Sequence, residues 1–129
     1  MKSSGLAHSG THLVADLHGI DAGKLMDVDA LASLLKRSAL AAGATVIYSH
    51  LHAFGVGQGV TGVVLLAESH ISIHTWPERG YAALDIFMCG QANPLLALAL
   101  IEEGLAPQSR EVQSLQRGCQ ALTSVHVIV

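Results

Sequence analysis

The segment from residue 45 to residue 88 constrains the fold most, because it holds four short strand-like runs separated only by turn residues. The runs cover residues 45–51, 63–67, 71–76 and 81–88 and are rich in apolar and β-branched residues, as β-strands are. Connections this short join antiparallel neighbours, since a parallel pair needs a crossover of a dozen or more residues. The segment therefore predicts an antiparallel sheet, in which the wholly apolar run 63–67 is expected to be buried on both faces.

A helical pattern lies on each side of this segment. Asp27 is a suitable N-cap and Gly43 a suitable end for the first helix, whose apolar side chains fall on one face. The pair Asn93-Pro94 has the order of an N-cap and a first helical residue, so a second helix is expected there, ending at Gly104. Three further strands are expected, at residues 11–18, 110–116 and 123–129. The order βαββββαββ predicts an α+β fold, a two-layer sandwich with a mostly antiparallel sheet and two helices on one face.

The composition limits the classes of protein to which the chain can belong. Its 129 residues suit a single domain, and 50% hydrophobic residues exclude a disordered chain. Only 13% of the residues are charged and the formal net charge is −3, so no basic surface for nucleic acid is expected. A small chain this apolar cannot hide all its hydrophobic surface alone, which favours an oligomer. The expected form is a homodimer.

The sequence also bears on where the protein acts. No apolar run approaches the roughly eighteen residues that a membrane-spanning helix needs, and residues 1–10 do not resemble a secretion signal. We therefore expect a soluble, cytoplasmic protein without membrane partners. In a reducing compartment its two cysteines, Cys89 and Cys119, are expected to be free thiols.

Polar and reactive side chains are concentrated on one predicted hairpin, where core residues would be expected. Ser69, His74 and Glu78 interrupt the apolar pattern, and Cys89 follows at the end of the next predicted strand. Burying such groups without partners is costly, so their density here indicates a functional site.

The first three of these groups lie within twelve contiguous residues, Ala67-Glu68-Ser69-His70-Ile71-Ser72-Ile73-His74-Thr75-Trp76-Pro77-Glu78. This run resembles the self-cleavage motif of bacterial, short-chain S-adenosylmethionine decarboxylase proenzymes, which depend on a pyruvoyl group. The resemblance implies cleavage between Glu68 and Ser69, into a β chain of residues 1–68 and an α chain of residues 69–129 that remain one domain. It also implies that Ser69 becomes the covalent pyruvoyl cofactor and that the enzyme is a carboxy-lyase of spermidine biosynthesis.

The same resemblance assigns roles in the maturation of the proenzyme. The Ser69 hydroxyl attacks the Glu68 carbonyl in an N→O shift, His74 removes the Cα proton of Ser69, and Thr61 stabilises the oxyanion. Ser69 and His74 are an odd number of residues apart, so in a regular strand they point to opposite faces. We therefore expect a bend or bulge around Ser69-His70.

Further roles concern the mature enzyme. The resemblance implies that the pyruvoyl ketone forms a Schiff base with the substrate's α-amine and accepts electrons as CO₂ leaves. Cys89 then returns a proton to the substrate carbon, Glu78 binds the ribose hydroxyls and Phe54 stacks on the adenine. The approach to the strand departs from the family pattern of Phe-x-Pro-x-Gly-Val-Ser-Gly: it reads Phe54-Gly55-Val56-Gly57-Gln58-Gly59-Val60-Thr61-Gly62, one residue longer and without the proline.

Other functions stay open at this point. A pyruvoyl-dependent arginine or ornithine decarboxylase would use the same cofactor but needs an acidic group for the substrate's distal cation. An unprocessed homologue would only bind a nucleoside or a partner chain. No metal site is expected, because the histidines lack a metal-binding spacing. A hydrolase using Ser69, His74 and Asp85 would not need cleavage, but the serine lacks the Gly-x-Ser-x-Gly turn.

Overall fold

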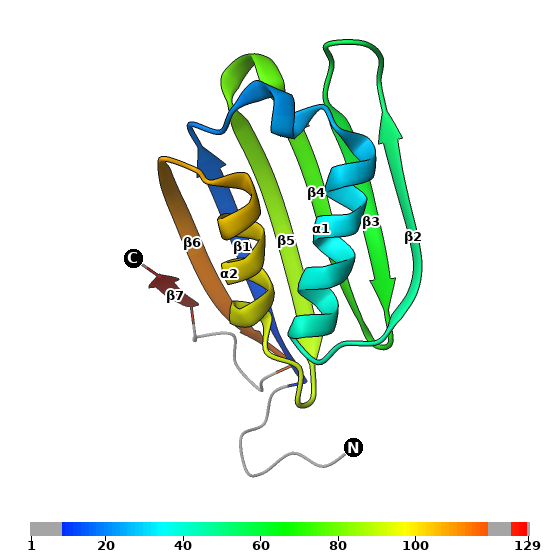
Figure 1. Cartoon of the computed structure of the whole chain (residues 1–129). Coiled ribbons are helices and arrows are strands. Elements are labelled where there is room, and N and C mark those ends of the chain that lie inside the picture. Colours follow the sequence, from blue (N-terminus) through cyan, green and yellow to red (C-terminus); the bar gives the residue numbers. More distant parts are fainter. Residues whose placement is uncertain (1–8, 119–124, 129) are drawn as a thin grey trace.

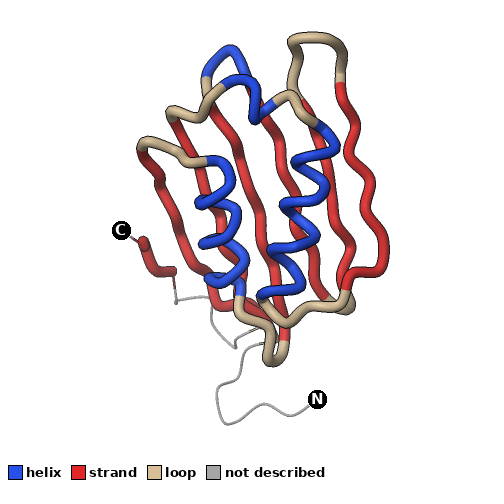
Figure 2. The backbone as a smooth tube through the Cα atoms, in the orientation of Figure 1, coloured by secondary structure: helices blue, strands red, loops and turns tan. Residues whose placement is uncertain are grey.

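The computed structural model describes residues 9–118 and 125–128 and arranges them in two layers (Figure 1). The described strands form a seven-stranded sheet in the order β2-β3-β4-β5-β1-β6-β7, in which all neighbouring strands are antiparallel. Both α-helices cover the same face of this sheet (Figures 1 and 2). In chain order the elements are β1 (Gly10–His18), η1 (Ala22–Leu25), α1 (Val28–Ala41), β2 (Val46–Ala53), β3 (Val60–Leu66), β4 (Ser69–Trp76), η2 (Pro77–Arg79), β5 (Tyr81–Cys89), α2 (Pro94–Leu105), β6 (Ser109–Arg117) and β7 (Val125–Ile128).

This architecture confirms the predicted α+β sandwich and the order of its elements. The start of α1 is also as predicted, because the Asp27 side chain accepts a hydrogen bond from the backbone N–H of Ala30 at 3.1 Å. After α1 the chain reverses at Gly43, whose φ of 88° is the left-handed conformation that glycine adopts without strain. The Asn93 side chain caps α2 in the same way, by accepting from the N–H of Leu95 at 3.0 Å.

The predicted end of α2 at Gly104 is wrong. The helix continues to Leu105, and Ala106 adopts the left-handed cap with a φ of 51°. Gly104 has another role: a Cβ at this position would lie 2.8 Å from both terminal carbons of Leu34 on α1. The glycine therefore lets the two helices approach each other closely instead of ending one of them.

The hydrophobic core lies between the sheet and the helices. Alternate strand positions face the helices, which is the period-two pattern of a sheet covered on one side. The largest fully buried side chains from the strands and helices are Leu13, Leu17, Leu25, Leu31, Leu35, Ile71, Ile73, Leu84, Ile86, Met88, Leu98 and Ile101. The other set of alternate positions lies on the face without helices, which we call the helix-free face.

The prediction that residues 63–67 are buried on both faces is wrong. Strand β3 runs from Val60 to Leu66, and its side chains alternate between the core and the helix-free face. Leu65, on the helix-free face, is 44% exposed. The apolar run suggested burial on both faces, but both helices pack on the same side of the sheet. The other side of β3 is therefore not covered by a helix.

The predicted bulge around Ser69-His70 is also wrong. Strands β3 and β4 pair in regular register from Leu66 opposite Ser69 to Thr61 opposite His74. The irregularity lies one residue earlier, in the turn, where Glu68 has a φ of 62°. Such a conformation costs a residue other than glycine roughly 1–3 kcal/mol.

Two remaining expectations concern the membrane and the thiols. Within the described part of the chain, no helix is both long and apolar enough to cross a membrane. Cys89 is a free thiol, as expected, whereas Cys119 lies outside the described residues.

Candidate functional site

The predicted site residues fall into two groups, one at each end of β4. The first, the turn group, consists of Glu68, Ser69 and Cys89. The Ser69 Oγ accepts a hydrogen bond from the backbone N–H of Cys89 at 3.2 Å. The Cys89 thiol donates to the carbonyl oxygen of Glu68 at 3.0 Å. The end of β5 therefore holds both sides of the Glu68–Ser69 peptide bond.

This arrangement suits a reaction at the Glu68 carbonyl. The hydroxyl that could attack follows the carbonyl directly in the chain, and the thiol of Cys89 already donates to the oxygen where negative charge would develop. The left-handed backbone of Glu68 adds local strain beside the same bond. The sequence did not indicate the contact between the thiol and this carbonyl, because it depends on how far β5 extends beside the turn.

The second group, the pocket group, consists of Phe54, Thr61, His74 and Glu78. These side chains line a hollow of about 430 Å³ between the β2–β3 loop and the end of β4, together with Trp76 and nearby loop residues. The Thr61 Oγ1 lies 3.2 Å from the His74 Nδ1, within hydrogen-bonding distance. The structure thus brings together four residues that the sequence assigned separately to processing and to substrate binding.

The two groups are far apart within one chain. Ser69 and His74 are five residues apart on a regular strand, and at 3.3 Å per residue about 17 Å of strand separates them. A base must come within about 3 Å of the proton it removes. His74 therefore cannot reach Ser69 of its own chain in this fold.

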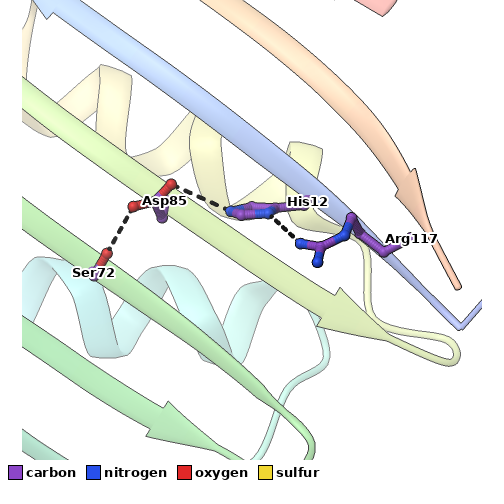
Figure 3. Close-up of polar contacts among 4 residues, drawn as sticks. All are labelled: His12, Ser72, Asp85 and Arg117. Atoms are coloured by element: carbon purple, nitrogen blue, oxygen red, sulfur yellow. Dashed lines mark hydrogen bonds and ion pairs between the residues drawn. The ribbon is translucent and has the colours of Figure 1, made fainter. Parts of the chain in front are cut away.

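Asp85, the third residue of the alternative Ser-His-Asp hydrolase, lies apart from both Ser69 and His74. Asp85 binds Ser72 and His12, each at 3.2 Å, so Ser69, His74 and Asp85 do not assemble into a triad. A chain of polar contacts instead runs along the helix-free face, from Ser72 on β4 through Asp85 on β5 to His12 on β1 and on to β6 (Figure 3). It ends at Arg117, whose guanidinium lies 3.1 Å from the His12 Nδ1. Because arginine can only donate, that nitrogen is the acceptor and the His12 Nε2–H donates to Asp85.

Sequence reasoning did not identify this network, although the alternation of polar residues along the strands was a usable signal. His12, Ser72 and Asp85 all occupy positions that alternate with core residues. The antiparallel register then places them on neighbouring strands, and only the strand order shows that β1 lies beside β5.

A row of rings lies beside the pocket group. Tyr81 stacks between Trp76 and His18, with ring centroids 5.0 and 5.1 Å away. Its hydroxyl donates to Asp16 at 2.6 Å. This hydrogen bond, with a smaller contribution from burial, raises the pKa of Tyr81 to about 12. Tyr81 is therefore a neutral donor at physiological pH.

The acidic, histidine and cysteine side chains do not suggest a metal centre. Across residues 9–118 and 125–128, no three of them gather in an arrangement that could hold a metal ion.

Comparison with known proteins places this geometry in a family. The family model for S-adenosylmethionine decarboxylase matches residues 11–118. The chain is 41% identical over 113 residues to the S-adenosylmethionine decarboxylase proenzyme of Geobacillus kaustophilus (strain HTA426), covering 88% of this chain and 90% of that protein. It is 44% identical over 110 residues to the proenzyme of the same name from Methanococcus maripaludis, covering 84% and 89%.

A solved structure supports the same assignment. The crystal structure of the adenosylmethionine decarboxylase from Aquifex aeolicus VF5 matches with a TM-score of 0.80 at 40% sequence identity, covering 91% of this chain and 97% of that one. The matched region includes both the turn group and the pocket group. The chain therefore belongs to the S-adenosylmethionine decarboxylase family.

Proposed function

We propose that this protein is a self-processing, pyruvoyl-dependent decarboxylase of S-adenosylmethionine that supplies the aminopropyl donor for spermidine biosynthesis. The observation that carries the proposal is the turn group, in which the Glu68 carbonyl accepts from Cys89 and directly precedes the Ser69 hydroxyl. Membership of the decarboxylase family supports the choice of substrate.

Maturation begins at the bond between Glu68 and Ser69. The Ser69 Oγ forms a bond to the Glu68 carbonyl carbon, the amide C–N bond breaks, and the hydroxyl proton passes to the freed amine, which leaves an ester. The Cys89 thiol stabilises the negative charge on the carbonyl oxygen during this shift. His74 then removes the Cα proton of Ser69, and Glu68 leaves as a carboxylate. Water then hydrolyses the resulting dehydroalanine, and its nitrogen is released as ammonia. The products are chain 1–68 and chain 69–129, the second of which begins with a pyruvoyl group.

The separation of the two groups leads us to propose a homodimer with a shared site. Since His74 cannot reach Ser69 of its own chain, the His74 and Thr61 of one protomer would act on Ser69 of its partner. The helix-free face is suited to this contact, because Cys89 and His74 both occupy positions of that face. It also exposes large apolar side chains, namely Val14, Tyr48, Leu65 and Val127. Two copies packed through this face bury them.

The residues of the turn group fit a pyruvoyl group at position 69, because the Cys89 backbone and thiol already border that position. When present, this group supplies an electron sink for the loss of CO₂. The Cys89 thiol returns a proton to the substrate's Cα. Glu78 accepts hydrogen bonds from the ribose hydroxyls, and Phe54, which is 56% exposed at the edge of the hollow, stacks on the adenine.

The test is decarboxylation by the purified protein of S-adenosylmethionine, arginine and ornithine in parallel, with intact-mass measurement of the chains. We expect two fragments that meet at the Glu68–Ser69 bond and CO₂ release from S-adenosylmethionine alone. Release from arginine or ornithine instead would favour the basic amino acid decarboxylase. A single uncut chain would indicate a homologue that only binds a nucleoside or a partner.

A further inference from the structure

We propose that Thr75 is a positioning residue for the pocket group: its buried hydroxyl holds Thr61 and His74 side by side. The proposal rests on the proposed function for what Thr61 and His74 do. The contacts that support it are independent of that function.

The hydroxyl of Thr75 connects β3 and β4 just beyond the point where their regular backbone pairing stops. That pairing runs up to Thr61 opposite His74. One position further, the Val60 backbone N–H donates to the Thr75 Oγ1 at 2.8 Å. A side chain therefore supplies the last bond between the two strands, immediately next to the pair of residues assigned to processing.

The same hydroxyl also fixes a third segment. It donates to the backbone carbonyl of Leu25, at the end of η1, at 2.7 Å. Thr75 is only 5% exposed, and Leu25 is fully buried. One oxygen thus accepts from β3 and donates to η1, so the hydroxyl uses its donor and one of its acceptor sites in a place closed to water.

The surroundings leave little room for the pocket wall to adjust. A side chain on Gly59, in the loop that lines the hollow, would collide with the Thr75 carbonyl oxygen. The loop therefore packs directly on the backbone of Thr75, while His74 and Trp76 on either side of it face the hollow. A shift of this residue would move the base and the wall of the pocket together.

Removing the hydroxyl would leave a buried N–H and a buried carbonyl without a partner in a core that excludes water. The beginning of β3 is then free to move relative to β4, and the 3.2 Å contact between Thr61 and His74 is lost. Misplacement by about 1 Å can slow a reaction about 10²-fold, because a base must be aligned with the proton it removes. The N→O shift keeps its donor from the Cys89 thiol to the Glu68 carbonyl, so it is slowed less than the elimination, which needs His74 in place.

The experiment compares Thr75→Val, which keeps the shape but removes the hydroxyl, with Thr75→Ser, which keeps the hydroxyl. Each full-length chain is followed by intact mass during self-cleavage, with and without hydroxylamine, which cleaves esters. We expect Thr75→Val to accumulate the hydroxylamine-sensitive ester and to eliminate it roughly 10²-fold more slowly than the original chain. Thr75→Ser should return the rate to within a few-fold.

Ser38→Ala is the matched control. Ser38 is also fully buried and its hydroxyl donates to the Leu34 carbonyl at 2.8 Å, but it lies within α1. This variant should lower the melting temperature without slowing self-cleavage of the folded chain. Thr75→Val cleaving at the original rate, or Thr75→Ser as slow as Thr75→Val, would overturn the positioning role.

If Thr75→Val does not fold, a comparison of Thr75→Cys with Thr75→Ser tests the same inference. Thr75→Cys keeps a donor, but its thiol forms longer and weaker hydrogen bonds than a hydroxyl. It should eliminate the ester more slowly than Thr75→Ser, and equal rates would refute the inference. A failure of the proposed function is distinguishable, because the unsubstituted chain would then not cleave at all.

Discussion

Two chains that cannot mature alone should mature together if the active site is shared between protomers. Ser69→Ala lacks the attacking hydroxyl, and His74→Ala lacks the base. In a heterodimer of the two, the intact Ser69 of the His74→Ala chain faces the intact His74 of the other chain. About 17 Å of strand separates these residues within one protomer, against the roughly 3 Å that proton removal requires, so the rescue must come from the partner.

The expected yield follows from the symmetry of the dimer. Random pairing of equal amounts of the two chains gives about half heterodimers, and each heterodimer has one complete site and one that lacks both groups. About half of the His74→Ala chains, and none of the Ser69→Ala chains, should therefore be cut. The uncut His74→Ala chains should remain as the ester and be split by hydroxylamine.

Co-expression of the two variants, with a mass label on one of them, allows intact mass to assign every fragment to its parent chain. The control pairs His74→Ala with the double variant Ser69→Ala/His74→Ala, which forms dimers but supplies no imidazole, so it should yield no rescue. Absence of fragments from the first pair, where the heterodimer is present, would refute the shared site. Full cleavage of His74→Ala alone would remove His74 as the base.

Three further substitutions test other parts of the structure. Cys89→Ala should still self-cleave, more slowly without its donor to Glu68, and should lose about 10²–10⁴-fold in turnover, measured as CO₂ release per mature chain; undiminished turnover would exclude the thiol as proton donor. Asp27→Ala should lower the free energy of unfolding by about 1 kcal/mol in urea titration, since it removes the cap of α1, and an unchanged midpoint would contradict this. The pKa of Tyr81 is raised to about 12, so the folded chain holds this proton more tightly than the unfolded chain and stability should fall as the pH rises from about 10 to about 12. Tyr81→Phe should remove that slope in pH-dependent unfolding, and a slope that persisted would assign it to another group.

The parts of the fold that the sequence predicted well are those fixed by local chemistry. Asp27 and Asn93 cap helices because their side chains reach a backbone N–H two or three residues later, a contact that needs no distant partner. The strand order is different in kind. Strand β1 lies between β5 and β6, and no local signal in residues 10–18 indicates either neighbour.

The errors arise where distant segments decide the role of a residue. Gly104 has the sequence context of a helix end, but it faces Leu34 of α1, so packing between the helices determines its role. Leu65 belongs to an apolar run typical of a doubly buried strand, yet no helix lies over it. The composition had already indicated that apolar surface would be left over, which is what this face provides.

The position of Ser69 and His74 in one short motif explains why a bulge was expected and why the structure does not need one. Residues close in sequence suggest one site in one chain, and under that assumption only a bent strand could join them. A straight β4 presents Ser69 at one end and His74 at the other, so two copies related by a two-fold axis can each complete the site of the other. In the proposed dimer, we expect the axis to pass near the middle of β4, beside Ser72 and its partner Asp85. Both oxygens of Asp85 already accept hydrogen bonds there, from Ser72 and His12, so its carboxylate can be covered by a second copy without being left unpaired.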